Sequence, residues 1–410
     1  MSEFTAPSPP SSSFSSSSTP SPKLQFLLAQ VKALSPQKQR ALSCIVGSCV
    51  ADAATRPWHW QYDQAALDST VGATDPAFWP VSQSPYYSIA TGRNACYNEL
   101  GSIVMMQALK PVSSTPDGAN GDIYDINRYI EEMVTLFGPG TEYRDSFERR
   151  PNAYDPAKRM QKREPVVGPW QQVAVTEFMK ELDAGCTGAT HISGKRRFSG
   201  NPDSEETDGL VTTLPYIAIM ACNGVDSATI QRRTADAATI LSSNLVSLRH
   251  TLSAAMIIQS IILKGESELN LDNFVAMAQS VDTAVVGDAG SGVEELVTEE
   301  LDTVFESLSE PHTKAVFRWG RTCANPGSFM GAILACFTAS EKRGSFADSI
   351  RALMRAGGCN CSRANLAGAV LGASFGFNDE SGISGRGIPI EWLAKTDRAE
   401  HLLELVLSKI

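Results

Sequence analysis

The sequence predicts an all-α protein. Apolar residues recur at helical spacing through most of the chain, the alternating pattern typical of strands is scarce, and few stretches resemble linkers. The chain has 410 residues, of which 42% are hydrophobic and 20% charged, so it is long enough to bury a large core. We therefore expect a disordered tail over residues 1–22 and one helical domain over residues 23–410.

The first 22 residues, MSEFTAPSPPSSSFSSSSTPSP, are rich in Ser and Pro and almost uncharged. With so few branched aliphatic side chains, burial cannot offset the entropy lost on ordering. The segment lacks the apolar stretch of a secretory signal. We expect a cytoplasmic or other intracellular protein, and the composition of the tail leaves organellar import open as an alternative.

The first ordered segment is expected at KLQFLLAQVKAL, followed by a buried helix in SPQKQRALSCIVGSCVADAAT. In this second segment Ser35 suits the N-cap, Pro36 suits the first helical position, and helical spacing continues until shortly before Pro57. Similar periodicity predicts further helices in NELGSIVMMQAL, IYDINRYIEEMVTLF, QQVAVTEFMKEL, LVTTLPYIAIMAC, DAATILSSNLVSLRHTLSAAMIIQSIIL, SFMGAILACFTAS, FADSIRALMRAG and RAEHLLELVLSKI.

Two long connections, residues 138–168 and 187–209, are predicted as functional or mobile loops. The second contains Lys195, Arg196 and Arg197, which could contact a phosphate. A solvated charge run is the favoured alternative for these three residues.

Charge and hydropathy exclude several classes of partner. The net charge of −10 gives no overall positive field, so no direct nucleic-acid binding is expected. Apolar runs such as AAMIIQSIILKG are shorter than the roughly 20 residues that span a bilayer, so no membrane helix is expected either. We expect the protein to be a monomer.

The nine cysteines are odd in number, and most lie within apolar helical patterns. This usage indicates reduced, buried thiols rather than a disulfide framework. The chain contains neither CxxC nor HExxH, so a structural zinc site is not expected.

The segment GGCNCSRANLAGAVLGASFG, residues 357–376, combines a glycine turn with a small-residue helix. Cys359 and Cys361 precede the helix N-terminus, whose field favours a thiolate, so they are candidates for a reactive or soft-metal pair. Two inert buried residues are an equal alternative, and strain opposes a disulfide between positions i and i+2. Small residues follow in a four-residue ladder that lets another backbone approach: Ala364, Gly368, Gly372 and Gly376.

Three motifs, in this order along the chain, resemble the ADP-ribosylglycohydrolase family. GSCVADAATRPWHWQYD is similar to the family's N-terminal Gly-Asp-Ala-x-Gly helix, and GGCNCSRANLAGAVLGASFGF is similar to its C-terminal Gly-Gly-Asp-x-Asp-Ser/Thr turn and helix. Together with a third segment, GIPIEWLAKT, these two motifs look closest to the J-crystallin and selenoprotein J branch of the family. The resemblance spans residues 36–405. It implies an orthogonal helical domain whose cleft holds two Mg²⁺ ions and ADP-ribose, and an enzyme that hydrolyses ADP-ribosyl glycosidic bonds.

The metal ligands that the resemblance implies are mostly replaced in this chain. The early Thr-Asp-Asp motif falls on Tyr97, Asn98 and Glu99, and the late Asp-x-Asp-Thr motif has Cys359, Cys361 and Ser362 in its ligand places. Mg²⁺ requires hard oxygen ligands, and thiols are poor partners for it. A standard dimagnesium site is therefore not expected, and catalysis would need an altered metal site.

Further site residues follow from the resemblance. Glu99 and Asp52 are the remaining acids and the catalytic candidates. Asp208 in TDGLVTTLP is predicted to line the substrate cleft, with a helix N-cap as the alternative. Gly385 and Gly387 in SGISGRGIP are predicted to meet a phosphate or ribose through backbone amides.

Four aromatic residues are also candidates for lining the cleft. His250 could approach it, although a core or surface histidine is the favoured alternative. Trp58, Trp60 and Tyr62 could stack on adenine, although aromatic core packing is the default.

Three functions stand as hypotheses. The first is a hydrolase of ADP-ribosyl bonds with an altered metal site. The second is a catalytically inactive ADP-ribose-binding protein or a structural protein like the J-crystallins. The third is a thiol redox protein that uses Cys359 and Cys361, and whether the chain is an enzyme at all stays open.

Overall fold

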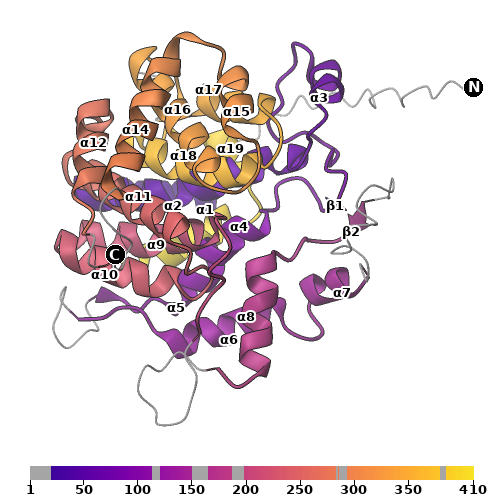
Figure 1. The fold of residues 1–410 in the computed structure, drawn as a ribbon, viewed down its shortest axis with the longest axis vertical. Helices are drawn as coiled ribbons and strands as arrows, with labels where there is room; N and C mark the ends of the chain where they lie inside the picture. Colours follow the sequence, from indigo (N-terminus) through magenta and orange to yellow (C-terminus); the bar gives the residue numbers. More distant parts are fainter. Residues whose placement is uncertain are drawn as a thin grey trace, which may run out of the picture.

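The computed structural model describes residues 20–112, 121–149, 165–186, 198–282, 285, 293–378 and 385–410, with side chains described from residue 297 onward in the segment that starts at 293. Within these residues helices predominate, and the all-α prediction is confirmed (Figure 1). Residues 1–19 of the expected tail and the basic run at residues 195–197 lie outside the described residues.

The helices follow one another along the chain, and several of the connections between them are long. The α-helices are α1 (Pro22–Lys32), α2 (Pro36–Thr55), α3 (Gln64–Val71), α4 (Cys96–Glu99), α5 (Met106–Ala108), α6 (Ile126–Phe137), α7 (Glu142–Glu148), α8 (Val173–Asp183), α9 (Asp208–Cys222), α10 (Ser227–Ala238), α11 (Leu245–Lys264), α12 (Leu271–Gln279), α14 (Val293–Glu306), α15 (His312–Trp319), α16 (Gly327–Glu341), α17 (Phe346–Arg355), α18 (Asn360–Phe375), α19 (Ile390–Lys395) and α20 (Ala399–Leu407). A π-helix spans Leu100–Met105, and 3₁₀ turns span Arg56–Trp58, Glu266–Glu268 and Ser307–Ser309. In the described part of the chain, β1 (Tyr87–Ser88) pairs in parallel with β2 (Val166–Val167).

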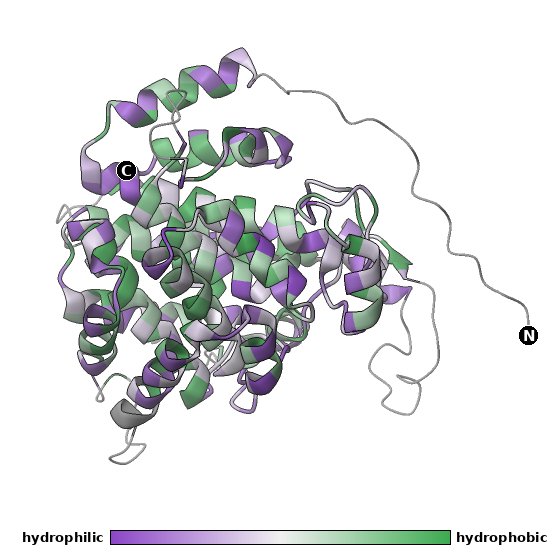
Figure 2. Ribbon diagram, turned by 90° about the horizontal axis from the view of Figure 1, so that it is seen from above, coloured by the Kyte–Doolittle hydropathy of each residue, from purple (hydrophilic) through white to green (hydrophobic). Residues whose placement is uncertain are grey.

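The centre of the fold is the pair α2 and α18, against which α9, α11 and α16 pack (Figure 1). Figure 2 shows hydrophobic residues concentrated in the inner helices and mixed with hydrophilic residues in the outer ones. Among the described residues, α11 is long and apolar enough to cross a bilayer, but 89% of its most apolar stretch is buried inside the fold. The core position of α11 accounts for its hydropathy.

Glycines set the distance between α2 and α18. A Cβ built on Gly368 would lie 2.5 Å from the carbonyl oxygen of Gly47, and one built on Gly372 would lie 2.2 Å from that of Ser43. Only residues without a Cβ permit this approach, so the predicted small-residue ladder is confirmed at both positions. Gly376 instead ends α18 with a φ of +66°.

The order of these contacts shows that α2 and α18 run antiparallel. Ser43 in the first half of α2 meets Gly372 late in α18, and Gly47 meets Gly368 one turn earlier. The C-terminal end of α2 therefore lies beside the N-terminal end of α18. This arrangement brings the early and late sequence motifs together from opposite ends of the chain.

Several element boundaries differ from the sequence-based expectation, each for a local reason. The helix expected over residues 236–263 breaks into α10 and α11, because the Asn244 side chain caps α11 by accepting from the N–H groups of Val246 and Ser247. The connection expected over residues 138–168 contains α7, which the Thr141 side chain caps. In α1 the cap is Ser21, so the helix begins at Pro22.

Candidate functional site

The candidate site lies where α2 ends and α18 begins, with α4 and the start of α9 beside them. Four of the predicted residues come together here and are buried: Asp52, Glu99, Asp208 and Cys359. Because they are removed from water, their charges and hydrogen bonds depend on one another rather than on solvent.

Asp52 is the centre of a closed hydrogen-bond network. Its Oδ1 accepts from the backbone N–H of Ala95 at 2.7 Å and from Asn94 at 3.0 Å, and its Oδ2 accepts from Asn365 at 2.9 Å. The Asn98 amide donates in turn to Oδ1 of Asn365 at 2.8 Å. We call Asp52, Asn94, Asn98 and Asn365 the amide network.

Burial raises the pKa of Asp52 to about 7, and three hydrogen bonds from Asn94, Ala95 and Asn365 oppose this shift. The nearby Glu99 carboxylate raises the pKa further. Asp52 therefore exchanges a proton near neutral pH although it is completely buried.

Glu99 is engaged in contacts of its own. The Tyr143 hydroxyl donates to Oε2 of Glu99 at 2.6 Å, and Nη2 of Arg398 lies 3.7 Å from Oε1. Burial raises the pKa of Glu99, while Arg398 and Tyr143 oppose the shift. The π-helix begins directly after this residue, and such bulges are frequent at functional sites.

A second group, which we call the thiol cluster, consists of His59, Glu206, Cys323 and Cys359. The Cys359 sulfur lies 3.3 Å from Nε2 of His59, and the neighbouring Cys323 affects the pKa of Cys359. Cys323 also donates to Oε1 of Glu206 at 3.2 Å. The Tyr87 hydroxyl lies 2.8 Å from Nδ1 of His59 and fixes the orientation of the ring.

The two sulfurs of the thiol cluster differ in proton affinity. Burial by itself raises the pKa of Cys359, but the Cys323 hydrogen bond, the charge and hydrogen bond of His59, and Ser362 hold it well below the usual value. The hydrogen bond to Cys359, together with burial, raises the pKa of Cys323.

Cys361 occupies a different environment from Cys359. Its sulfur accepts from the Thr55 hydroxyl at 3.6 Å, and burial raises its pKa well above the usual value. The pKa values of Cys359 and Cys361 are therefore shifted in opposite directions. Ser362 donates to the carbonyl oxygen of Cys359 at 2.7 Å and supports the turn.

The start of α9 adds acids and unsatisfied polar groups. Burial raises the pKa of Asp208, and the neighbouring Glu206 raises it further. Three buried side-chain oxygens near this helix end have no hydrogen-bond partner, and they belong to Asn98, Thr207 and Thr212. Such groups are usual where water or a ligand supplies the missing partner.

These residues do not fit two Mg²⁺ ions. Both oxygens of Asp52 are occupied by N–H donors, and Glu99 is held by Tyr143 and Arg398. Cys359 and Cys361 supply soft sulfur atoms where magnesium requires oxygen. Within the described residues, no group of three or more His, Cys, Asp or Glu side chains is arranged to hold a metal.

Other predicted residues lie elsewhere. Gly387 packs against Gly376 at the C-terminal end of α18, and Gly385 is two residues away in the sequence. Because α18 has 16 residues and is about 24 Å long, this end is far from the candidate site at its N-terminal end. The structure does not bring these glycines to the candidate site. The ring nitrogens of His250 contact Oε2 of Glu300 and the carbonyl oxygen of Val246, so both already have partners in the protein.

Aromatic side chains gather beside the thiol cluster. The Trp60 ring centroid lies 4.3 Å from that of His59, and Trp170 packs edge-on against Trp60 at 5.1 Å. Trp58 belongs to the core and donates its indole N–H to Pro76. Tyr62 packs near the Arg321 guanidinium, whose centre is 5.7 Å from the ring.

The sequence reasoning missed five residues of the amide network and the thiol cluster: Asn94, Asn365, His59, Glu206 and Cys323. His59 lies inside the quoted early motif, and Asn365 follows Cys361 by one helical turn, so both could have been found by asking which polar side chains share a face with the motif residues. Glu206 and Cys323 lie in connections that carry no recognisable pattern. Only the tertiary structure places them beside Cys359.

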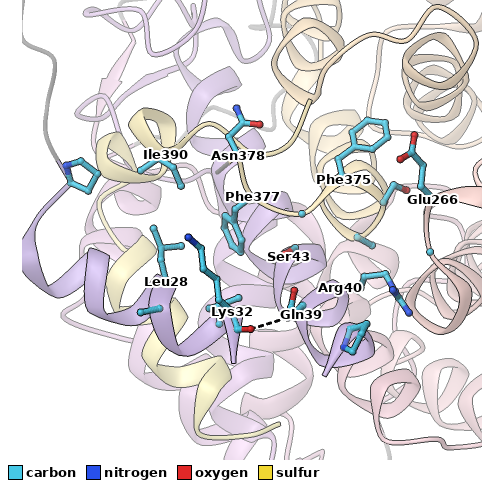
Figure 3. A pocket seen from close by; sticks show the side chains of 18 of the residues that line it. Leu28, Lys32, Gln39, Arg40, Ser43, Glu266, Phe375, Phe377, Asn378 and Ile390 are labelled. Carbon is cyan, nitrogen blue, oxygen red and sulfur yellow. Dashed lines mark hydrogen bonds between the residues drawn. The ribbon is translucent and has the colours of Figure 1, made fainter. Parts of the chain in front are cut away.

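A groove lies at the opposite end of α18 (Figure 3). Its volume is about 1070 Å³, and it is bordered by α1, α2, α19 and residues that follow α18. Arg40 donates to the carbonyl oxygens of Ile262 and Leu263, while Glu266 pairs with Arg386. Two of the charged side chains in its lining therefore already have partners within the protein.

Comparisons with known proteins cover nearly the whole chain. A family model described as ADP-ribosylglycohydrolase matches residues 34–409. Crystallin J1A of Tripedalia cystophora is 26% identical over 380 residues, which are 91% of this chain and 97% of the relative. Crystallin J1B of the same organism is 25% identical over 368 residues, or 90% and 95% of the two chains. A solved structure titled ADP-ribosylglycohydrolase-related protein complex is similar over 92% of this chain and 98% of its own, with 15% identity and a TM-score of 0.48.

Proposed function

Because this chain belongs to the ADP-ribosylglycohydrolase family, we propose that it binds a ligand of the ADP-ribose class without Mg²⁺ and does not carry out dimagnesium hydrolysis. The observation that carries this proposal is the closed amide network around Asp52. Three N–H donors already occupy both carboxylate oxygens, so Asp52 is engaged with the protein rather than free to bind a cation.

The ligand would meet the polar groups at the start of α9. The Thr212 hydroxyl is buried and has no hydrogen-bond partner in the protein, and neither does that of Thr207. The raised pKa values of Asp208 and Glu206 favour their protonated forms, which can donate to phosphate or ribose oxygens. Uncharged carboxyl groups also avoid repelling the phosphates of the ligand.

Isothermal titration of ADP-ribose into the reduced protein tests the proposal. We expect the same micromolar Kd with MgCl₂ and with EDTA. Thr212→Val is expected to weaken binding at least fivefold, because it removes a hydroxyl that no protein group uses. The control is Thr303→Val, at an exposed position on α14 whose hydroxyl bonds to its own helix, and it should bind like the wild type.

Two outcomes contradict the proposal. Binding that disappears with EDTA would mean that the altered residues still assemble a metal site. If ADP-ribose binds under neither condition, a structural role, as the name crystallin suggests for the relatives, becomes the better reading.

A second candidate function is hydrolysis of an ADP-ribosyl bond with Asp52 as acid or base. The pKa of about 7 favours this role, because a group that titrates near neutral pH can both give and take a proton. Release of ADP-ribose from an ADP-ribosylated peptide, abolished by Asp52→Asn, would support it. Release no faster than in buffer would refute it.

A further inference from the structure

We propose that the buried guanidinium of Arg56 binds a phosphoryl group of the ligand directly. The inference rests on the proposed function, because a ligand of the ADP-ribose class carries a diphosphate group. It adds a binding residue that belongs neither to the amide network nor to the polar groups at the start of α9.

Arg56 lies beside the candidate site, at the C-terminal end of α2. Its backbone N–H donates to the carbonyl oxygen of Asp52, so the two side chains stand one helical turn apart on the same side of the helix. The preceding residue, Thr55, donates its hydroxyl to the Cys361 sulfur at 3.6 Å, and its carbonyl oxygen accepts from Asn360 at 3.4 Å. The backbone of Arg56 therefore lies next to both Asp52 and the turn that starts α18.

Most of the hydrogen-bonding capacity of Arg56 is unused. Its exposed fraction is 0%, and Nη2 donates to the carbonyl oxygen of Ala90 at 2.8 Å. Nε and Nη1 are also buried, and neither has a hydrogen-bond partner in the protein. Guanidinium N–H groups donate and never accept, so the missing partner is an acceptor.

The positive charge of Arg56 also lacks a carboxylate partner among the described residues. Asp52 stands one turn away, but its two oxygens accept from Asn94, Ala95 and Asn365. A buried charge without a counter-charge is costly, and a planar guanidinium matches the oxygens of a phosphate. An anion of this kind satisfies both the unused donors and the charge.

Arg56 is close to solvent although its own side chain is covered. Ala90, whose carbonyl oxygen it contacts, is an exposed residue in the connection between β1 and α4. Asn94 and Ala95 in the same connection hold Asp52. A phosphate that enters beside Ala90 therefore reaches the guanidinium without crossing the helical core.

Pyrophosphate is the probe that isolates this contact, because it carries phosphoryl groups without adenine or ribose. In isothermal titration with EDTA, pyrophosphate should bind the full chain and displace ADP-ribose. Arg56→Met should weaken the binding of both at least about tenfold, because it keeps an apolar side chain and removes every donor. Arg56→Lys restores the charge without the planar guanidinium, so it should recover part of the loss.

Arg40→Met is the matched control. Arg40 also lies on α2, but its Nε and Nη2 already donate to the carbonyl oxygens of Ile262 and Leu263. This variant should bind pyrophosphate and ADP-ribose like the wild type.

Thermal unfolding separates a binding role of Arg56 from a structural one. Saturating pyrophosphate should raise the Tm of the wild type and of Arg40→Met by about 3 °C or more, and should leave the Tm of Arg56→Met unchanged. A merely structural arginine would lower the Tm when replaced, but pyrophosphate would still raise it. Arg56→Lys, the milder change, serves the same comparison if Arg56→Met does not fold.

The outcomes distinguish this inference from the proposed function. If pyrophosphate binds and needs Arg56 while ADP-ribose does not bind, the anion site stands and the proposed ligand is wrong. If ADP-ribose binds but pyrophosphate neither binds nor competes, Arg56 is not the phosphate contact and the inference is overturned. It is also overturned if the Arg56 variants bind both compounds like the wild type.

Discussion

Replacement of Asp52 by Asn should change how stability depends on pH. Burial raises the pKa of Asp52 from 3.8 to about 7, so between these values the folded chain holds a proton that the unfolded chain releases. The stability that this proton contributes is fully present below pH 3.8 and is lost as the pH rises towards about 7. Asn does not titrate, so the variant should lack this loss.

The size of the effect follows from the same shift. One pKa unit corresponds to about 1.4 kcal/mol, and pH 5 lies about two units below the folded-state pKa of Asp52. Between pH 5 and pH 8 the wild type should therefore lose about 2.7 kcal/mol more stability than the variant. Asn also places an NH₂ group opposite N–H donors, which costs about 1–3 kcal/mol at every pH.

Urea denaturation followed by circular dichroism at pH 5, 6, 7 and 8 measures this difference. The deficit of Asp52→Asn relative to the wild type should shrink steadily as the pH rises. Asp75→Asn is the matched control. Burial raises the pKa of Asp75, but the hydrogen bonds from Arg351 and Ala77 and the charge of Arg351 together lower it below its ordinary value. The difference between this variant and the wild type should therefore stay constant from pH 5 to pH 8. Parallel profiles for the wild type and Asp52→Asn would refute the reasoning.

Two further substitutions test the packing and the hydrogen bonds of the site by the same denaturation at pH 7. Gly368→Ala should lower the free energy of unfolding by about 2 kcal/mol, because a Cβ only 2.5 Å from a backbone oxygen of α2 overpacks the helix pair by more than the gain in helix propensity. Gly344→Ala is the control and should change stability little, because the nearest atom to its Cβ is 3.5 Å away. Equal effects at the two positions would contradict the close approach of the helices. Tyr143→Phe should cost about 1–3 kcal/mol, because buried Glu99 loses its donor. Tyr124→Phe removes a hydroxyl without a partner and should cost less, so the reverse order would count against the contact.

Much of the fold could be predicted because it is encoded locally. Apolar spacing located the central helices, and the pattern of small residues indicated that another backbone lies against Gly368 and Gly372. The break between α10 and α11 was missed because apolar spacing continues across it, and the capping side chain of Asn244 decides the boundary.

The sequence by itself determined the helical class, the family and the replacement of the metal carboxylates, because each of these lies in a short pattern of neighbouring residues. Only the tertiary structure decided that Asn365 and Asp52 are hydrogen-bonded, and that His59 lies beside the sulfur of Cys359. The physical reason is that these contacts join segments far apart in the chain. Their distances depend on how closely α2 and α18 pack and on the course of the connections beside them, which no local pattern records.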